Sequence, residues 1–468
     1  MTAAESLVTE ADYKERYGFV TNAEYVEFEK GLSEDTVRRI SKLKGEPDWM
    51  LEKRLLGYKV FAGKPTPRWG ADLSGIDYDD IYYYKQPKAK EGKSWEEVPE
   101  EIKKTFEKLG VPEAERKFFA GAEAQFASGV VYSHINEELE KLGVIFTDTD
   151  TAVRKYPELM KKYFGTVIPP TDNKFAALNT AVWSGGSFIY VPKGVRVPMP
   201  LNAYFRINAE KSGQFERTLI VVDEGGEAVY IEGCTAPAYS ANSLHAAVVE
   251  VVAHKNARVQ YVTVQNWAKN IYNLVTQRAH VYENARMSWV DANIGSKTNM
   301  KYPSIYLHGR NAQGEILSIA LASDGQVQDS GGKVYHLAPN TASKIVSKSI
   351  SKGSGLTTFR GLVYIGKEAE NAKVNTTCDA LLLDSDARTN TYPYADIQRN
   401  DALLSHEAKV GRISEDDVFY LMSRGISESD AIAMIILGFL NDLTKALPME
   451  YSLELKRLIK LDMAGSVG

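Results

Sequence analysis

Two cysteines are the only thiols in this chain of 468 residues, and each stands in a stretch that otherwise resembles an ordinary strand. Cys234 lies in "YIEGCTAPAYS" and Cys378 in "KVNTTCDALLLD". A free thiol is either small buried filler or, once deprotonated, a nucleophile and metal ligand. Two cysteines cannot form a disulfide framework, and the acidic, polar N-terminus has no apolar core of a signal peptide. The sequence therefore predicts free thiols in the reducing cytoplasm.

Further candidate metal ligands follow Cys378 in "LLSHEAKVGRI", where His406 and Glu407 stand 28 and 29 residues after the cysteine. Thiolate, imidazole and carboxylate together suit iron or zinc. The chain contains no Cys-x-x-Cys or His-x-x-x-His spacing. A packed core cysteine beside a solvated His–Glu pair fits the same residues, so the pattern alone leaves both readings open.

A repeat in the middle of the chain determines how these residues are positioned. Short alternating apolar runs are separated by turns that share an asparagine, and these asparagines are 28, 27, 29 and 31 residues apart: Asn256, Asn284, Asn311, Asn340 and Asn371. One step earlier the turn is "EGGEA", with Gly226 thirty residues before Asn256. Asparagine tolerates the left-handed backbone of tight turns, and a fixed period of this length indicates stacked units. Each unit reads as strand, turn, strand, turn.

Two architectures fit such a unit, a parallel β-solenoid and an antiparallel sandwich. Hairpins of a sandwich do not require one turn chemistry to recur in phase, whereas stacked coils do. We therefore expect a mainly β fold, a flattened parallel β-helix with coils of about 28 residues. The expected division is a mostly helical region over residues 1–165, the β-helix over 166–405 and a helical region over 406–468.

Helix signals support the two flanking regions. Ser33 opens "SEDTVRRISKLKGEPDWMLEKRLLGYKVF", and apolar residues at helical spacing also occur at 98–110 and 134–144. Near the other end, "SEDDVFYLMSRG" and "SESDAIAMIILGFLNDLTKAL" each begin with Ser-x-x-Asp, which is typical of a helix N-terminus.

The solenoid has consequences for the thiols. Cys234 follows Gly226 by eight residues and Cys378 follows Asn371 by seven, so the two share a coil phase but lie five coils apart. At a strand spacing of ~4.8 Å the separation is roughly 24 Å, far beyond disulfide reach. The difference of one residue predicts opposite strand faces. His406 and Glu407, about one coil further on, are expected above Cys378.

Bulk properties exclude several functions. The net charge of −5 argues against a nucleic-acid-binding protein, and no apolar run is long enough to span a membrane. No phosphate-binding loop is present, so any ATP is expected to enter through another chain, although a flavin can bind without such a fingerprint. The acidic stretch 384–401 would suit a polysaccharide-cleaving β-helix, but it reads first as a loop.

Long blocks of the chain, among them "AVWSGGSFIYVPKGVRVPMPLNAYFRIN", "YIEGCTAPAYS" and "TTCDALLLDSDARTNTYPYADIQRNDALLSHEAKVG", resemble the SufB branch of the SufB/SufD family. The resemblance covers nearly the whole chain. It implies a right-handed parallel β-helix flanked by helical domains. It also implies a scaffold of the SUF machinery that builds a transient iron–sulfur cluster and has no ATPase activity of its own.

The resemblance also implies roles for single residues. Cys234 matches the cysteine that accepts persulfide sulfur from a cysteine desulfurase and its sulfur carrier, and Cys378 matches the cysteine at which the cluster forms. His406 and Glu407 match further ligands. Other positions match a sulfur route through the β-helix: Arg206, Asn208, Gln265 and Trp267. Arg206 or a neighbouring cation is also expected to lower the pKa of the Cys234 thiol.

The partners implied are SufC, an ABC-type ATPase that docks on the C-terminal helices, and SufD, a homologous subunit that pairs with the end of the β-helix. A purely structural SufD-like subunit without a cluster is the rival interpretation. One departure concerns the N-terminal cysteine cluster of some SufB proteins, since this chain has no cysteine before Cys234. One thiol is a small ligand set for an iron–sulfur cluster, which suggests a labile cluster at an interface.

Overall fold

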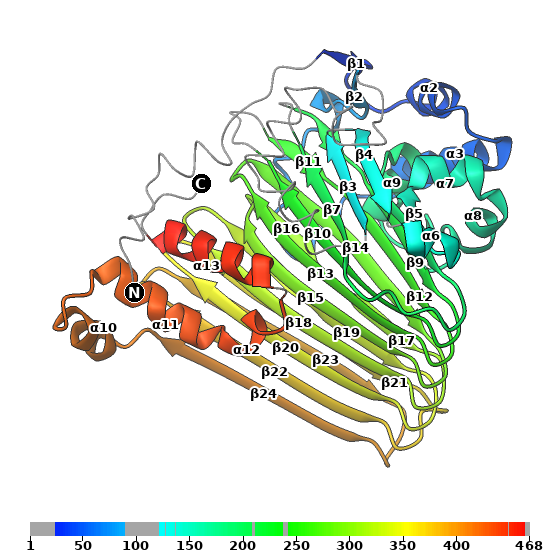
Figure 1. Cartoon of the computed structure of the whole chain (residues 1–468). Helices are drawn as coiled ribbons and strands as arrows, with labels where there is room; N and C mark the ends of the chain where they lie inside the picture. The colour runs from blue at the N-terminus through cyan, green and yellow to red at the C-terminus, as the bar shows by residue number, and fades with distance from the viewer. Residues whose placement is uncertain are drawn as a thin grey trace.

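The computed structural model describes residues 24–88, 121–126, 128–135, 137–207, 211–236, 242–447 and 449–463. Asn208 and the helix expected at 98–110 lie outside these residues. Two long sheets form the body of the molecule, and through the solenoid the chain passes alternately from one to the other, with some passes through the second sheet split into two short strands (Figure 1). The chain thus winds through one sheet and then the other, coil after coil.

The first sheet has ten strands, and the order across it is β24 (Leu403–Arg412), β22 (Lys373–Leu382), β20 (Ala342–Ser351), β18 (Gln313–Ala322), β15 (Arg286–Gly295), β13 (Arg258–Trp267), β10 (Glu227–Thr235), β7 (Leu201–Arg206), β3 (Gly121–Phe126) and β4 (Gly129–Ile135). Neighbours are parallel except β3 and β4.

The second sheet has twelve strands, and the order along its main path is β23 (Arg388–Ile397), β21 (Leu356–Ile365), β19 (Val327–His336), β16 (Thr298–Lys301), β14 (Ile271–Val281), β12 (Val248–Ala253), β9 (Arg217–Val222), β6 (Ser187–Val191) and β5 (Ile145–Asp148). Three short strands join beside this path: β8 (Gly213–Gln214), β11 (Ser243–His245) and β17 (Ser304–Leu307). Only β5 and β6 pair antiparallel in this sheet. The parallel β-solenoid is confirmed, and the antiparallel sandwich is excluded.

The turns explain the stacking. All five turn asparagines have a left-handed backbone, with φ between 53° at Asn371 and 60° at Asn256. Their side chains also bond from coil to coil, for example from Asn311 Nδ2 to Asn284 Oδ1 at 2.8 Å. In the preceding turn the left-handed residue is Gly225, with φ 70°, and not Gly226. The predicted turn chemistry is confirmed, but its phase in the first coil shifts by one residue.

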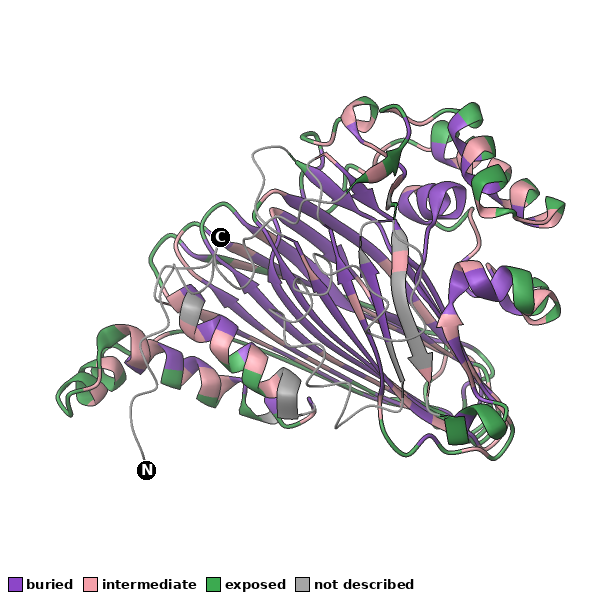
Figure 2. Ribbon diagram, turned by 45° about the horizontal axis from the view of Figure 1, so that its top comes forward, coloured by how far each residue is buried: buried purple, intermediate pink, exposed green. Residues whose placement is uncertain are grey.

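Side chains between the two sheets form the main core, and Figure 2 shows most strand residues buried. Apolar residues fill most of this interior, including the largest buried rings, Trp267 and Trp289. Both cysteines belong to the same interior cluster. Among the described helices, none has the length and apolar character needed to cross a membrane.

Most helices before the solenoid cover its first coils: α2 (Glu34–Lys44), α3 (Asp48–Gly63), the 3₁₀ turn η1 (Tyr78–Asp80), α6 (Glu137–Lys141), α7 (Thr149–Lys155), α8 (Pro157–Tyr163) and α9 (Lys174–Val182). Ser33 caps α2 as expected, with Oγ accepting from Thr36 N at 3.1 Å. The helix α9 is buried except for its first residue, Lys174, and packs closely on α3, where a side chain at Gly57 would lie 2.8 Å from the Ala177 carbonyl oxygen. A small antiparallel pair, β1 (Tyr25–Glu27) and β2 (Lys85–Pro87), lies outside the solenoid.

Four helices follow the last coil: α10 (Glu415–Met422), α11 (Glu428–Phe439), α12 (Asn441–Thr444) and α13 (Met449–Met463). The predicted Ser-x-x-Asp caps are present, with Ser414 and Ser427 each accepting from the backbone three residues later. The helices α11 and α13 lie on the outer face of the ten-stranded sheet (Figure 1) and bury Ile436 and Leu458 there.

Strands extend beyond the expected limits of the β-helix, residues 166–405, at both of its ends. Before residue 165 the chain already contributes β3, β4 and β5 to the sheets, and β24 extends to Arg412, beyond residue 405. The second difference matters for the site, because His406 and Glu407 lie on a strand.

Candidate functional site

Cys378 and His406 come together at the open end of the solenoid. Cys378 lies on β22 and His406 on the neighbouring edge strand β24, where His406 pairs with Thr376. The two side chains share one face, and Cys378 Sγ lies 3.6 Å from His406 Nε2. Burial raises the pKa of the Cys378 thiol, although a hydrogen bond from Thr391 opposes this shift. This pair is the first part of the predicted ligand set.

Glu407 does not join that pair. It is opposite Thr377 in the ladder, so its side chain points to the other face of the sheet. There it is exposed, and its Oε2 lies 3.9 Å from Lys409 Nζ. In the described ranges no three His, Cys, Asp or Glu side chains form a group able to hold a metal ion. The chain by itself therefore presents one thiol and one imidazole.

Cys234 lies deep inside the solenoid on β10 and is fully buried. Its Sγ donates to Glu232 Oε1 at 3.4 Å, and Tyr261 donates to the other oxygen of that carboxylate at 2.8 Å. Burial, followed by the charges of Glu232 and Glu216, raises the pKa of the Cys234 thiol well above its usual range, while Lys301 acts in the opposite direction. These surroundings therefore favour the protonated thiol over the thiolate.

Arg206 is not the cation beside this thiol. In the ladder Phe205 lies opposite Cys234 and Arg206 lies opposite Thr235, so the guanidinium is on the outer face of the sheet. Its Nη1 donates to Thr235 Oγ1 at 3.2 Å. Of the two expected possibilities, Arg206 or a neighbouring cation, the geometry leaves the neighbouring cation, Lys301, as the group that acts to lower the pKa of the Cys234 thiol.

Two other predicted route residues do face the interior. Gln265 is paired directly with Cys234 on β13, and its Oε1 accepts from Asn273 Nδ2 at 2.6 Å. Trp267, two residues further along, packs its ring 4.7 Å from the ring of His245. Asn208 lies outside the described residues, so its predicted role stays a prediction.

A cross-strand row joins the regions of the two cysteines. Six buried side chains occupy one register position on the inner face of consecutive strands: Glu232, Thr263, Asp291, Ser318, Ser347 and Cys378. We call these residues the inner row. A second row, two residues further along the strands, begins with Cys234 and Gln265. Five strand steps separate the cysteines, as predicted, which at ~4.8 Å per step corresponds to roughly 24 Å.

The two cysteines therefore share a face, and the expectation of opposite faces is wrong. Cys234 follows the left-handed Gly225 by nine residues and Cys378 follows Asn371 by seven, a difference of two. Side chains on a strand alternate with period two, so the same face results. Each member of the inner row stands seven residues after a left-handed turn residue, a spacing that could have identified the row from the sequence.

The facing sheet adds polar groups that sequence reasoning missed. His245 Nε2 lies 2.8 Å from Glu216 Oε2, and Lys301 Nζ donates to Asp291 of the inner row at 2.8 Å. Burial favours a lower pKa for His245, but the charge of Glu216 and its hydrogen bonds outweigh burial and raise the pKa. The interior between the cysteines is thus lined by hydroxyl, amide, carboxylate and amine groups, which are able to hold polar sulfur species and protons.

The solenoid ends in two sheet edges at this site. Among the described residues, no strand pairs beyond β23 or β24. Several large apolar side chains are exposed on these strands: Tyr392, Tyr394, Ile397, Leu403, Leu404 and Val410. An uncovered edge with such residues is a template for pairing with another chain. The Cys378–His406 pair therefore lies where a second protein could cover it.

Comparison with known proteins gives two family matches. Residues 205–439 match the family described as SUF system FeS cluster assembly, SufBD core domain, and residues 97–203 match the SufBD protein N-terminal region. The chain is 56% identical over 458 residues to the iron–sulfur cluster assembly SufBD family protein of Staphylococcus aureus (strain MRSA252), a match that covers 98% of each chain. The protein of the same description from Staphylococcus epidermidis is also 56% identical, again over 98% of each chain.

Proposed function

The chain belongs to the SufBD family of iron–sulfur cluster assembly proteins, and on that basis we propose that it is a SufB-type scaffold. In this proposal Cys234 accepts persulfide sulfur and Cys378 anchors a transient cluster. The observation that carries the proposal is the inner row, because it is a line of buried, mostly polar side chains between two thiols that are too far apart to bridge.

Sulfur uptake is a thiol–persulfide exchange. The Cys234 thiolate attacks the terminal sulfur of a donor persulfide, a new S–S bond forms at Cys234, and the donor leaves as a thiolate. No electrons are gained or lost in this exchange. Burial and Glu232 disfavour the thiolate, whereas Lys301 favours it. Gln265, Trp267 and the inner row are the residues past which this outer sulfur would then move. The S–S bond at Cys234 breaks when the sulfur is passed on, and its conversion to cluster sulfide uses two electrons from an external reductant.

Cluster building takes place at the open end. Iron, as substrate, displaces the thiol proton of Cys378 and binds its sulfur, and the His406 imidazole is placed to supply a nitrogen ligand. The remaining ligands come from sulfide or a partner chain. Glu407 can ligate the iron only if a rearrangement of β24 or a partner chain brings its carboxylate to the inner face. The proposal assigns no residue to a flavin.

Partner docking follows from the exposed surfaces. The edges of β23 and β24 suit a homologous SufD-type subunit, which would cover the Cys378–His406 pair. The helix α10 has no buried residue and presents Phe419, 72% exposed, beside Tyr420. We assign this helix to a SufC-type ATPase, which would bring ATP to the complex. Free thiols fit a reducing cytoplasmic location.

The rival function is a structural SufD-like subunit that completes the complex without a cluster. The edge strands suit this role equally well. It gives no reason, however, for a thiol and an imidazole 3.6 Å apart at the edge or for a polar interior that leads to them.

Anaerobic reconstitution with iron and sulfide tests the scaffold role. We expect the wild type to show cluster absorption and Mössbauer signals, Cys378→Ala to lose them, and His406→Ala to hold less iron. Glu407→Ala is the matched control on the other face and should keep the wild-type spectrum. Equal iron in Cys378→Ala and wild type, or no cluster in either, would contradict the role of Cys378 and favour the structural subunit.

A further inference from the structure

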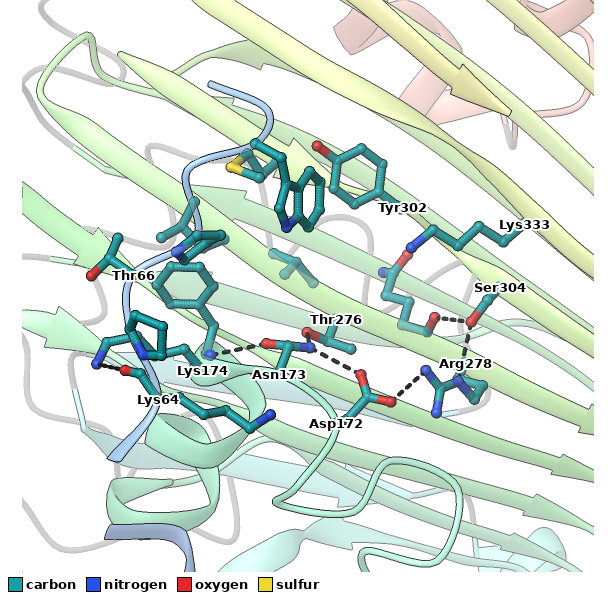
Figure 3. A pocket seen from close by; sticks show the side chains of 18 of the residues that line it. Lys64, Thr66, Asp172, Asn173, Lys174, Thr276, Arg278, Tyr302, Ser304 and Lys333 are labelled. Carbon is teal, nitrogen blue, oxygen red and sulfur yellow. Dashed lines mark hydrogen bonds and ion pairs between the residues drawn. The ribbon is translucent and has the colours of Figure 1, made fainter. Parts of the chain in front are cut away.

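A cavity of about 820 Å³ lies on the outer face of the twelve-stranded sheet, separate from the cysteines and the inner row. The loop after α3, residues 64–69, forms one side, and strands β14, β17 and β19 form the other. Figure 3 shows Lys64 and Thr66 on the loop, and Arg278, Ser304 and Lys333 on the strands. The volume is within the range of sites that hold small organic ligands.

Two rows of side chains make the strand side of this cavity. Arg278, Ser304 and Lys333 are in register on three adjacent strands, so two cations flank a hydroxyl. Two residues further along, Tyr306 and Tyr335 are also in register. Their rings stack with their centroids 4.2 Å apart and an interplanar angle of 17°. On a strand two residues span about 7 Å, so a charged row runs beside an aromatic row.

The charge of the cavity is unbalanced. Five cationic side chains line it: Lys64, Arg68, Lys174, Arg278 and Lys333. Asp172 is the only acidic one among the described lining residues, and it binds Arg278 at 2.7 Å.

Four of those cations have no acidic partner among the described residues. No carboxylate in that part of the chain lies within ion-pair distance of Lys64, Arg68, Lys174 or Lys333, and Lys174 donates to the backbone carbonyls of Phe61 and Lys64. Burial lowers the pKa of Lys333, which an anion bound beside it would reverse. The cavity therefore favours an anionic ligand.

An exposed indole faces the same space. Trp69 is 55% exposed at the tip of the loop, and its ring lies 5.8 Å from the ring of Tyr302. An indole is a good stacking partner for a nucleobase. Inorganic phosphate would use the cations but not this ring, and a neutral aromatic compound would use the ring but not the cations.

We infer that this cavity binds a nucleotide, with the phosphates on the Arg278–Ser304–Lys333 row and the base against Trp69. The inference is independent of the scaffold role, because the cavity and the cysteines are on different faces. Recognition is by side chains, since the cavity has no glycine-rich phosphate loop, so binding should be salt-dependent and no hydrolysis is expected.

Titration calorimetry of the purified full-length chain with ADP tests this inference, and adenosine and pyrophosphate serve as the two halves of the ligand. We expect ADP to bind more tightly than either half. Lys333→Met should weaken ADP binding about tenfold, the equivalent of one charge-assisted contact. Trp69→Ala should weaken it about five- to tenfold through lost stacking. Lys367→Met, on an exposed turn outside the cavity, should bind ADP like the wild type.

Circular dichroism spectra and melting temperatures establish that each variant is folded, and Lys64→Ala provides a second test on the loop side of the cavity. Pyrophosphate binding as tight as ADP binding would overturn the nucleotide assignment. ADP binding that is absent, or that is unchanged in Lys333→Met, Trp69→Ala and Lys64→Ala, would overturn the site itself.

Discussion

Alanine in place of Glu250 should lower the free energy of unfolding by about 3–5 kcal/mol, because it leaves a buried guanidinium without its partner. Glu250 and Arg217 are both fully buried, and Arg217 Nη2 donates to Glu250 Oε2 at 2.6 Å. The carboxylate also accepts from the backbone of Gly165, Val167 and Ile168. One side chain therefore fixes the segment between α8 and α9 on the second sheet.

Urea unfolding followed by circular dichroism measures this effect. The matched control is Glu224→Ala, which removes a carboxylate 2.7 Å from Lys193 on the exposed surface, where water screens the pair. We expect the unfolding midpoint of the control to stay close to that of the wild type. A Glu250→Ala midpoint as close to wild type as that of the control would show that the buried pair does not stabilise the fold.

Leucine in place of Ser347 should stop sulfur from reaching Cys378. Ser347 is the inner-row residue next to Cys378, and it is buried between the sheets. A larger apolar side chain fills the path there and removes a hydroxyl. Overpacking of this kind costs about 1–3 kcal/mol, so the variant should still fold. The expected result is persulfide that accumulates on Cys234 and a cluster yield near background.

Two variants control for this result. Ser347→Ala keeps the space open and should retain sulfur transfer. Lys344→Leu places the same leucine on the same strand but on the exposed outer face, and should transfer sulfur like the wild type. If Ser347→Leu builds clusters at the wild-type rate, sulfur does not pass along the inner row.

The repeat made most of the solenoid predictable. Residues that tolerate a left-handed backbone recur at each turn, so asparagine spacing alone located the coils and the distance between the thiols. The phase of the first coil was less certain, because either Gly225 or Gly226 can adopt that backbone. This one-residue difference in phase determines whether the side chains of Cys234 and Cys378 lie on the same face of the sheet or on opposite faces.

Other parts of the site depend on contacts that no local pattern encodes. His406 and Glu407 are adjacent in sequence, yet a strand sends them to opposite faces, and only the extension of β24 to Arg412 reveals this. Arg206 likewise lies opposite Thr235, so the alternation of side chains along the strand puts it on the face away from Cys234. The groups beside Cys234, such as Glu216 and Lys301, come from the other sheet, so their proximity results from how the two sheets pack.

The location of sulfane sulfur over time tests the two-thiol relay most directly. A cysteine desulfurase with its charged sulfur carrier would be mixed with the chain, the thiols trapped by alkylation, and both cysteines examined by mass spectrometry. In the wild type we expect persulfide first on Cys234 and then at Cys378, and in Cys234→Ser we expect none at Cys378. Persulfide that reaches Cys378 equally fast in Cys234→Ser would contradict the relay.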